Sequence, residues 1–183
     1  TKNILHQQIN IFTVQLSFFH SYHDLQIIAV YDPIYEEEFA WMRWLPHLRL
    51  RSVNVLGMVS SPRARDLVLG SMYQILKDRA GRSGDGKKTG GYLPHYLFLI
   101  DEPAWILNHG IMEYLYMDGS ALGFSVVYTS DIQARLPEFI GTMLSIQNSE
   151  EGVLLTEAGE YLEQGLKLYD ARDADCEWMA RNL

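Results

Sequence analysis

The sequence predicts an α/β protein with a mainly parallel central sheet, helices on both faces and short extra strands near the C-terminus. One observation is the alternation of amphipathic and continuously apolar stretches along the 183 residues, which is typical of helix–strand units. A second is the apolar run HYLFLI at 95–100, between Pro94 and Pro103. A run this short predicts a strand buried on both faces. A third is the acidic pair Asp101 and Glu102 directly after it, at the strand end where open α/β sheets bind ligands.

The first half of the chain predicts three helices and two strands. The spacing predicts a helix over 1–20, with one apolar face made by Leu5, Ile9, Phe12, Leu16 and Phe19. The β-rich run 25–31 predicts a buried strand that ends at Asp32 and Pro33. A short helix is expected over 35–43 and a short apolar strand over 54–60. Ser61 as N-cap and Pro62 at the first helical position open a longer helix that runs to about Ala80.

The second half continues the alternation. The stretch 81–91, rich in Gly and Lys, predicts a mobile loop before the central strand. A helix is expected over about 104–117, a strand over 123–129, and a turn or short helix over 132–139. Two edge strands are expected over 142–146 and 152–156, and Asp173 is expected to cap a last helix with Cys176 and Ala180 on its apolar face.

Composition bounds the class of protein. With 48% hydrophobic and 21% charged residues, the chain has the composition of an ordinary globular domain. No apolar stretch approaches the roughly 20 residues that cross a bilayer, and the single cysteine excludes an internal disulfide framework. The net charge of −8 argues against a non-specific nucleic-acid binder. Ten of the fifteen Lys and Arg lie between Arg43 and Lys88, and acids dominate after Glu138; this segregation fits either docking to neighbouring domains or a solvated surface.

The loop 81–91 contains a near-match to a P-loop, which is the glycine-rich phosphate-binding turn of nucleotide hydrolases. Gly81 is followed after four residues by Gly86 and Lys87, but Lys88 stands where the pattern needs Ser or Thr. A P-loop also joins a strand to a following helix, whereas this loop is expected to join a helix to a following strand. The sequence therefore favours a surface loop over a phosphate site.

Two strand ends carry the candidate chemistry. Asp101 could hold Mg²⁺ and Glu102 could orient or deprotonate an attacking water, as the acids after a buried strand do in P-loop hydrolases. The alternative is that the two acids cap the helix that follows. Ser130, after the next strand, could sense a terminal phosphate or could cap the following turn. The pair His20 and His23 has metal-ligand spacing but falls in a turn without a nearby cysteine, so no metal is expected there.

Several strings, in chain order, resemble one family. They are LSFFHSYHDLQIIAVYD, WMRWLPH, RDLVLGSMYQILKDR, PHYLFLIDE, IMEYL, LPEFI and a closing WMARNL. Together they cover nearly the whole chain, which resembles the juxtamembrane ATPase-like module of EssC/YukB-type coupling ATPases. That family consists of membrane-bound FtsK/SpoIIIE-type proteins of type VII secretion systems.

The resemblance implies that residues 1–183 are a single degenerate FtsK/SpoIIIE-like domain of RecA-like P-loop ATPase type. The domain would be a fragment of a larger membrane-anchored multidomain protein, soluble by itself, on the cytoplasmic side of the cell membrane. Asp101 and Glu102 match the second nucleotide motif by position, while a P-loop would lie upstream of Thr1. No cofactor is therefore expected in this chain, and the alternative is weak Mg-ATP binding, with Asp101 on Mg²⁺ and Ser130 near the nucleotide.

By the same resemblance, the expected function is a non-catalytic link between the membrane anchor and the motor domains in protein export. The expected partners are other ATPase domains of the same chain, neighbouring copies and membrane secretion components, without a specific nucleic acid. The alternatives are an active ATP-hydrolysing motor domain with its P-loop upstream of Thr1, in which Glu102 would be catalytic, and a DNA-translocase-type domain.

Overall fold

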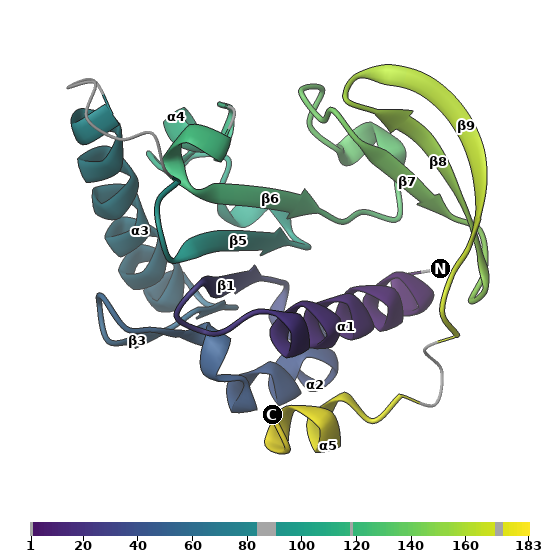
Figure 1. Cartoon of the computed structure of the whole chain (residues 1–183), viewed down its shortest axis with the longest axis horizontal. Helices are drawn as coiled ribbons and strands as arrows, with labels where there is room; N and C mark the ends of the chain where they lie inside the picture. The colour runs from purple at the N-terminus through teal and green to yellow at the C-terminus, as the bar shows by residue number, and fades with distance from the viewer. Residues whose placement is uncertain (1, 84–90, 118, 171–173) are drawn as a thin grey trace.

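The computed structural model describes residues 2–83, 91–117, 119–170 and 174–183. Its centre is a parallel four-stranded sheet in the order β4-β1-β5-β6 (Figure 1). The strands are β1 (Leu25–Val30), β4 (Met58–Val59), β5 (His95–Ile100) and β6 (Phe124–Tyr128). Helices lie on both faces, and a small antiparallel sheet follows. The predicted α/β class is confirmed, and the arrangement is consistent with a RecA-like fold.

The strand β5 lies inside the sheet because it is apolar on both faces. It pairs in parallel with β1 along its whole length and with β6 on the other side. Tyr96, Phe98 and Ile100 point into one hydrophobic cluster, while Leu97 and Leu99 point into the other. Alternate side chains of one strand therefore belong to two separate cores.

The long helix α3 (Pro62–Ser83) covers the first of these cores with Leu69, Met72 and Leu76. Its expected start is confirmed, because the backbone N–H of Ala64 donates to Oγ of Ser61 at 3.2 Å. Residues 84–90 of the predicted mobile loop lie outside the described residues. Since α3 precedes the loop and β5 follows it, the segment does join a helix to a strand.

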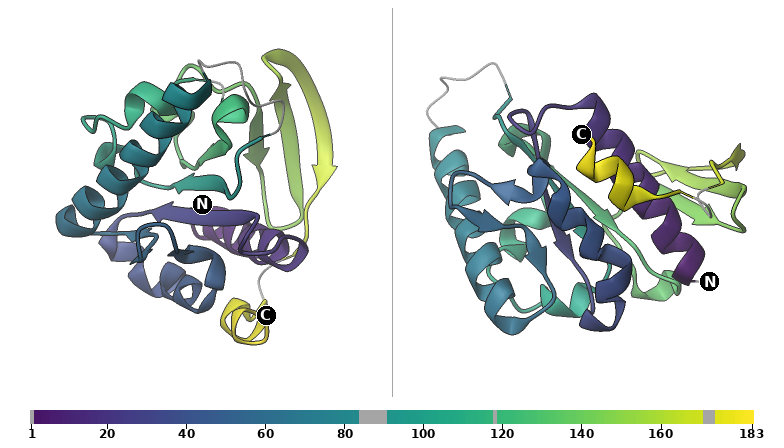
Figure 2. Two further views of the ribbon diagram at one scale, coloured as in Figure 1. Left: turned by 60° about the vertical axis from the view of Figure 1, so that its left-hand side comes forward. Right: turned by 90° about the horizontal axis from the view of Figure 1, so that it is seen from below.

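The second core is covered by α1 (Lys2–Phe19), by a run of short helical turns and by the C-terminal helix (Figure 2). The short elements are η1 (Pro33–Tyr35), α2 (Glu36–Phe39), η2 (Ala40–Trp44), η3 (Pro46–Leu48) and α5 (Cys176–Arg181). The N-cap of α5 is Asp175, whose carboxylate accepts from the N–H of Trp178 at 2.8 Å. The cap expected at Asp173 lies outside the described residues.

The predicted apolar face of α1 is confirmed only in part, since Ile9 and Leu16 pack against the second core. Phe12 and Phe19 are 37% and 76% exposed, whereas His6, Thr13 and Ser17 are buried. The helix therefore turns a partly polar face towards the sheet. Because buried polar groups need partners, this face is where a network of long-range contacts is expected.

The predicted helix over 104–117 is wrong. The chain instead forms η4 (Pro103–Trp105), irregular turns and the single helical turn α4 (Met112–Leu115). The sequence Asn108-His109-Gly110 disfavours helix at this point, yet Ile106 and Ile111 still fill the core. A further 3-10 turn, η5 (Gly119–Leu122), leads into β6, and η6 (Gln133–Arg135) follows it.

The two strands expected near the C-terminus exist, but they do not extend the central sheet. With a third strand they form an antiparallel sheet in the order β7-β8-β9. The members are β7 (Met143–Ile146), β8 (Glu151–Glu157) and β9 (Glu160–Lys167). A second small sheet is the hairpin of β2 (Arg49–Leu50) and β3 (Val55–Leu56). Among the described residues, no helix is long and apolar enough to cross a membrane.

Candidate functional site

The acidic pair follows β5 at the edge of the sheet where β1 and β6 also end. The backbone N–H of Asp101 donates to the carbonyl of Val30 at 2.8 Å, and the N–H of Thr129 donates to the carbonyl of Ile100 at 2.9 Å. These backbone bonds hold Asp101 and Thr129 on neighbouring strands. The sequence therefore correctly places the acids at the carboxyl end of a buried strand.

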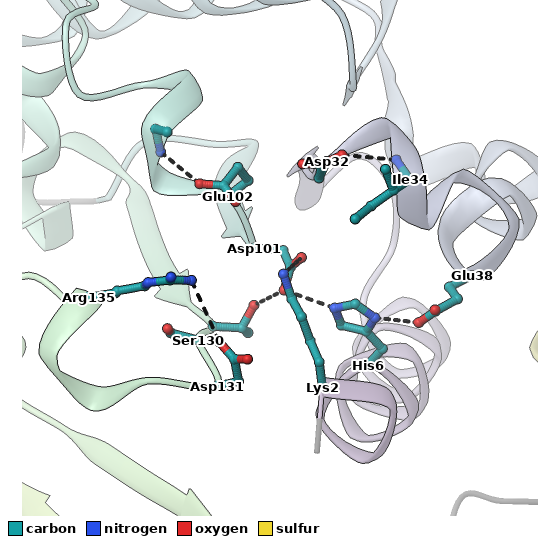
Figure 3. A network of polar contacts seen from close by, with 12 residues as sticks. Lys2, His6, Asp32, Ile34, Glu38, Asp101, Glu102, Ser130, Asp131 and Arg135 are labelled. Atoms are coloured by element: carbon teal, nitrogen blue, oxygen red, sulfur yellow. Dashed lines mark hydrogen bonds and ion pairs between the residues drawn. The ribbon is translucent and has the colours of Figure 1, made fainter.

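Asp101 is 7% exposed and is surrounded by donors from its own chain (Figure 3). Thr129 donates its hydroxyl to Oδ1 at 2.6 Å, and Nε2 of His6 donates to the same oxygen at 3.0 Å. The Lys2 ammonium lies 3.2 Å from Oδ2. That oxygen is buried and accepts no hydrogen bond from the described residues, so its interaction with Lys2 is mainly electrostatic.

His6 bridges two carboxylates, because its Nδ1 contacts the Glu38 carboxylate while its Nε2 contacts Asp101. The ring lies edge-on to Tyr35 and Phe39, with ring centroids 4.7 and 4.8 Å away. A ring that donates to a carboxylate from both nitrogens is favoured in its charged form. His6 therefore ties α1 to both β5 and α2.

The pKa values of the network reflect these contacts. Burial alone would raise the pKa of Asp101, but hydrogen bonds from His6 and Thr129 and the nearby cations hold this pKa below its usual range. Burial alone would lower the pKa of His6, but the bonds and charges of Asp101 and Glu38 raise it. Burial alone would lower the pKa of Lys2, but the interactions with Asp101, together with the charges of Tyr35 and Glu102, raise it. The network is thus a set of mutually stabilised charges.

Glu102 occupies a capping position. Its Oε1 accepts from the N–H of Ala104 at 3.2 Å, and Pro103 begins the 3-10 turn that follows. The end of β1 is built the same way, since Asp32 accepts from Ile34 at 2.9 Å before a turn that begins at Pro33. Figure 3 shows the Glu102 carboxylate apart from Asp101. The structure thus separates the two acids that the sequence placed in one site.

Ser130 makes a local turn. Its hydroxyl donates to the carbonyl of Ile132 at 2.9 Å and accepts from the N–H of the same residue at 3.1 Å. Together with Asp131 and Leu136, it lines a cavity of about 400 Å³ that also borders β7. Neither Asp101 nor Glu102 lines that cavity. The three predicted site residues therefore share one edge of the sheet but do not converge on one pocket.

The residues present do not fit a Mg²⁺ ion. Two cationic side chains, Lys2 and His6, already lie against Asp101, where a divalent ion would be repelled. Oxygen ligands are what Mg²⁺ requires, but the Glu102 carboxylate is used as a cap and the Ser130 hydroxyl in a turn. Within the described ranges, no group of three His, Cys, Asp or Glu side chains could hold a metal.

The sequence interpretation missed Lys2, His6, Glu38 and Thr129. Their contacts join residues up to 95 positions apart, so no local motif marks them. A signal was nevertheless present in α1, where His6, Asn10, Thr13 and Ser17 repeat at steps of four, three and four. That spacing defines a polar helix face, and Asn10 also reaches the carbonyl of Glu38 at 3.1 Å.

The fold and the acidic strand end define an α/β domain of RecA-like architecture, and comparison with known proteins gives its family. The chain is 32% identical over its whole length to "Type VII secretion system protein EssC" of Staphylococcus aureus, in strains MSSA476 and NCTC 8325. It is 31% identical, over 84% of its length, to "ESX secretion system protein EccC" of Geobacillus thermodenitrificans. No protein-family model matches the chain.

The chain belongs to the EssC/EccC family of secretion-system proteins, as the resemblance of its sequence predicted. It spans 12% of the length of the EssC relatives and 10% of the EccC relative. It therefore corresponds to one segment of these longer proteins.

Proposed function

We propose that the chain is a non-catalytic, ATPase-like module of a type VII secretion coupling protein. As a single domain of a larger membrane-anchored protein, on the cytoplasmic side of the membrane, it would link the anchor to the motor domains. Its partners would be those neighbouring domains, further copies and other secretion components. It would act by contact and conformational transmission. The family supports the secretion role, because the relatives are named as secretion-system proteins.

The observation that carries the non-catalytic part is the neutralisation of Asp101 by its own chain. Lys2, His6 and Thr129 all contact the carboxylate, which leaves it a packing role between α1 and the sheet. To coordinate a metal through Oδ2, the carboxylate would have to give up its ion pair with Lys2. Breaking a buried charged pair costs about 3–5 kcal/mol, so metal binding at Asp101 would compete with the fold itself.

A second candidate function is an active motor domain that binds Mg-ATP. The observation in its favour is the position of Lys2, in the first turn of α1 and 3.2 Å from Asp101. The first turn of a helix attracts anions, and a cation at this position could bind a phosphate group. A DNA-translocase role is less well supported, since the net charge of −8 opposes phosphate-backbone binding.

Calorimetric titration with ATP and Mg²⁺ separates the two candidates when the chain is extended upstream of Thr1, so that it includes the segment in which the motor candidate would carry its P-loop. The non-catalytic module gives no saturable binding in the wild type, in Asp101→Asn or in Glu102→Gln. Asp131→Asn is the matched control, because it removes an acid from the neighbouring strand end without touching the Asp101 network. Micromolar binding that is lost in Asp101→Asn and kept in Asp131→Asn would establish the motor candidate instead.

A measurement in the full-length protein tests the same point in its biological setting. Glu102→Gln removes the carboxylate that hydrolysis would require while it leaves a side-chain oxygen to cap η4. Export of the secreted substrate is expected to continue at the wild-type rate. A loss of export at normal protein levels would argue for a catalytic Glu102.

A further inference from the structure

Two surfaces of opposite character lie at opposite ends of the molecule. The β2–β3 hairpin and β9 are far apart in Figure 1 and also in the view from below in Figure 2. The first surface is a groove rich in arginine, and the second is an exposed acidic strand. Neither can contact the other within one copy.

The basic surface is a groove of about 470 Å³ between η2 and the β2–β3 hairpin. Its lining includes Trp44, Arg49, Leu50, Arg51 and Leu56. Arg49 and Arg51 are exposed, and the guanidinium of Arg51 lies 4.4 Å from the centre of the Tyr22 ring. Trp44 and Leu56 are 45% and 41% exposed. The groove therefore offers an apolar floor with guanidinium groups at its rim.

The acidic surface is the outer strand β9 with the turn that precedes it. Tyr161 and Leu162 are 72% and 45% exposed, and they lie between the exposed acids Glu160 and Glu163. The Tyr161 hydroxyl donates to Glu163 at 2.6 Å, which orients the ring beside the acid. From 150 to 170 the chain carries six acids and one basic residue, Lys167. Large apolar side chains on an open edge strand are typical of an interaction surface.

The two surfaces complement each other in charge and in hydrophobicity. Tyr161 could cover the apolar floor, while Glu163, which its hydroxyl contacts on the same side of the strand, meets Arg49 or Arg51. Glu160 adds negative charge at the start of the strand. Arginine forms planar, paired hydrogen bonds with carboxylates, and an aromatic anchor in a pocket is a common centre of binding energy. We propose that β9 of one copy docks in the arginine groove of a second copy. This inference does not depend on whether the domain hydrolyses ATP.

The geometry makes the contact heterologous, because each copy contributes a different surface to it. A bound pair still presents one open groove and one open strand, on different copies, so the assembly can grow head to tail. The charged rim predicts an association that weakens as salt screens it, since the Debye length falls from about 10 Å at 0.1 M to about 3 Å at 1 M.

Sedimentation of the purified chain tests the proposal, with a pair of charge-reversed variants. The groove variant is Arg49→Glu with Arg51→Glu, and the strand variant is Glu160→Arg with Glu163→Arg. The average mass of the wild-type protein is expected to increase with protein concentration, over a range up to about 1 mM. In 1 M salt the protein should return to monomer. Each variant alone should stay monomeric, because its own two surfaces now repel each other.

An equal mixture of the two variants tests whether restored charge complementarity also restores association. The acidic groove of one accepts the basic strand of the other, and the unchanged surfaces also match, so growth with concentration should return. Arg63→Glu with Lys77→Glu is the matched control, since it makes the same charge change on exposed positions of α3 and should associate like wild type. Circular dichroism checks that each variant is folded.

Three results would overturn the proposal. Wild-type protein could remain monomeric over the whole concentration range, which would leave both surfaces to other domains of the longer protein. It could form a dimer that does not grow, which indicates a symmetric contact. Finally, folded single variants could associate as wild type does, or their mixture could remain monomeric.

Discussion

Replacement of Thr129 by valine tests the structural role of Asp101 at a single hydrogen bond. Thr129 is 5% exposed, and its hydroxyl donates to Oδ1 of Asp101 at 2.6 Å. Valine has nearly the same shape but lacks the donor, so the change removes the bond without opening a cavity. A buried carboxylate then keeps His6 and Lys2 but loses its shortest hydrogen bond.

The expected cost follows from the charge and burial of the acceptor. Hydrogen bonds to charged groups contribute about 1.5–3 kcal/mol, and short O–H···O⁻ bonds are among the stronger ones. Because two cationic partners remain, we expect the free energy of unfolding to fall by about 2 kcal/mol. With a urea dependence of about 2 kcal/mol/M, the unfolding midpoint falls by about 1 M.

Urea unfolding followed by fluorescence measures this change, and Thr129→Ser is the matched control. Serine keeps the donor and loses only a methyl group, so it should cost about 1 kcal/mol, less than valine. If Thr129→Val unfolds at the wild-type midpoint, or if serine is the more damaging change, the hydroxyl does not stabilise the ionised Asp101.

Two further predictions concern pH and backbone packing. The raised pKa of His6 means that its charged contacts stabilise the fold fully below pH about 6.5, and that this stabilisation is lost as the pH rises through the folded-state pKa. The lowered pKa of Asp101 makes its own contribution disappear only in acid. The difference in free energy of unfolding between wild type and His6→Phe, measured by urea titration, should therefore decrease from pH 6 to pH 9. A difference that stays constant over this range would contradict a charged His6. For packing, a Cβ on Gly57 would come within 2.5 Å of the carbonyl oxygen of Ile27, so Gly57→Ala should destabilise by about 1–3 kcal/mol. Gly70 lies in α3 with nothing within 4 Å of an added Cβ, so Gly70→Ala should stabilise by about 0.4–1 kcal/mol; thermal melts that rank the two variants in the opposite order would contradict the packing described.

The parts of the fold that local patterns determine could be predicted from the sequence. The apolar run of β5 predicts a doubly buried strand, and Ser61 with Pro62 marks the start of α3, because both signals lie within a few residues. Strand β9 was missed because its side chains are mostly polar and exposed. Its strand conformation depends on pairing with β8, which no periodicity within 160–167 reveals.

The candidate site could be predicted only in position. The location of Asp101 and Glu102 at a strand end follows from the chain itself, but their roles depend on what the fold brings to them. His6 was overlooked because the apolar residues of α1 suggested a different buried face. In the structure the polar face is buried, since Asp101 and Glu38 supply partners for His6 and so offset the cost of its burial.

We propose that Asp101 holds α1 to the sheet and does not serve a metal–nucleotide site. The most direct test of this proposal is the free energy of unfolding of the wild type and of Asp101→Asn, each measured with and without saturating Mg-ATP. We expect the free energy of unfolding to be lower by several kcal/mol in Asp101→Asn and to be unaffected by Mg-ATP in either protein. A ligand present at 100 times its dissociation constant would stabilise by about 2.7 kcal/mol, and a stabilisation of that size in the wild type, absent in Asp101→Asn, would show that Asp101 serves a nucleotide site.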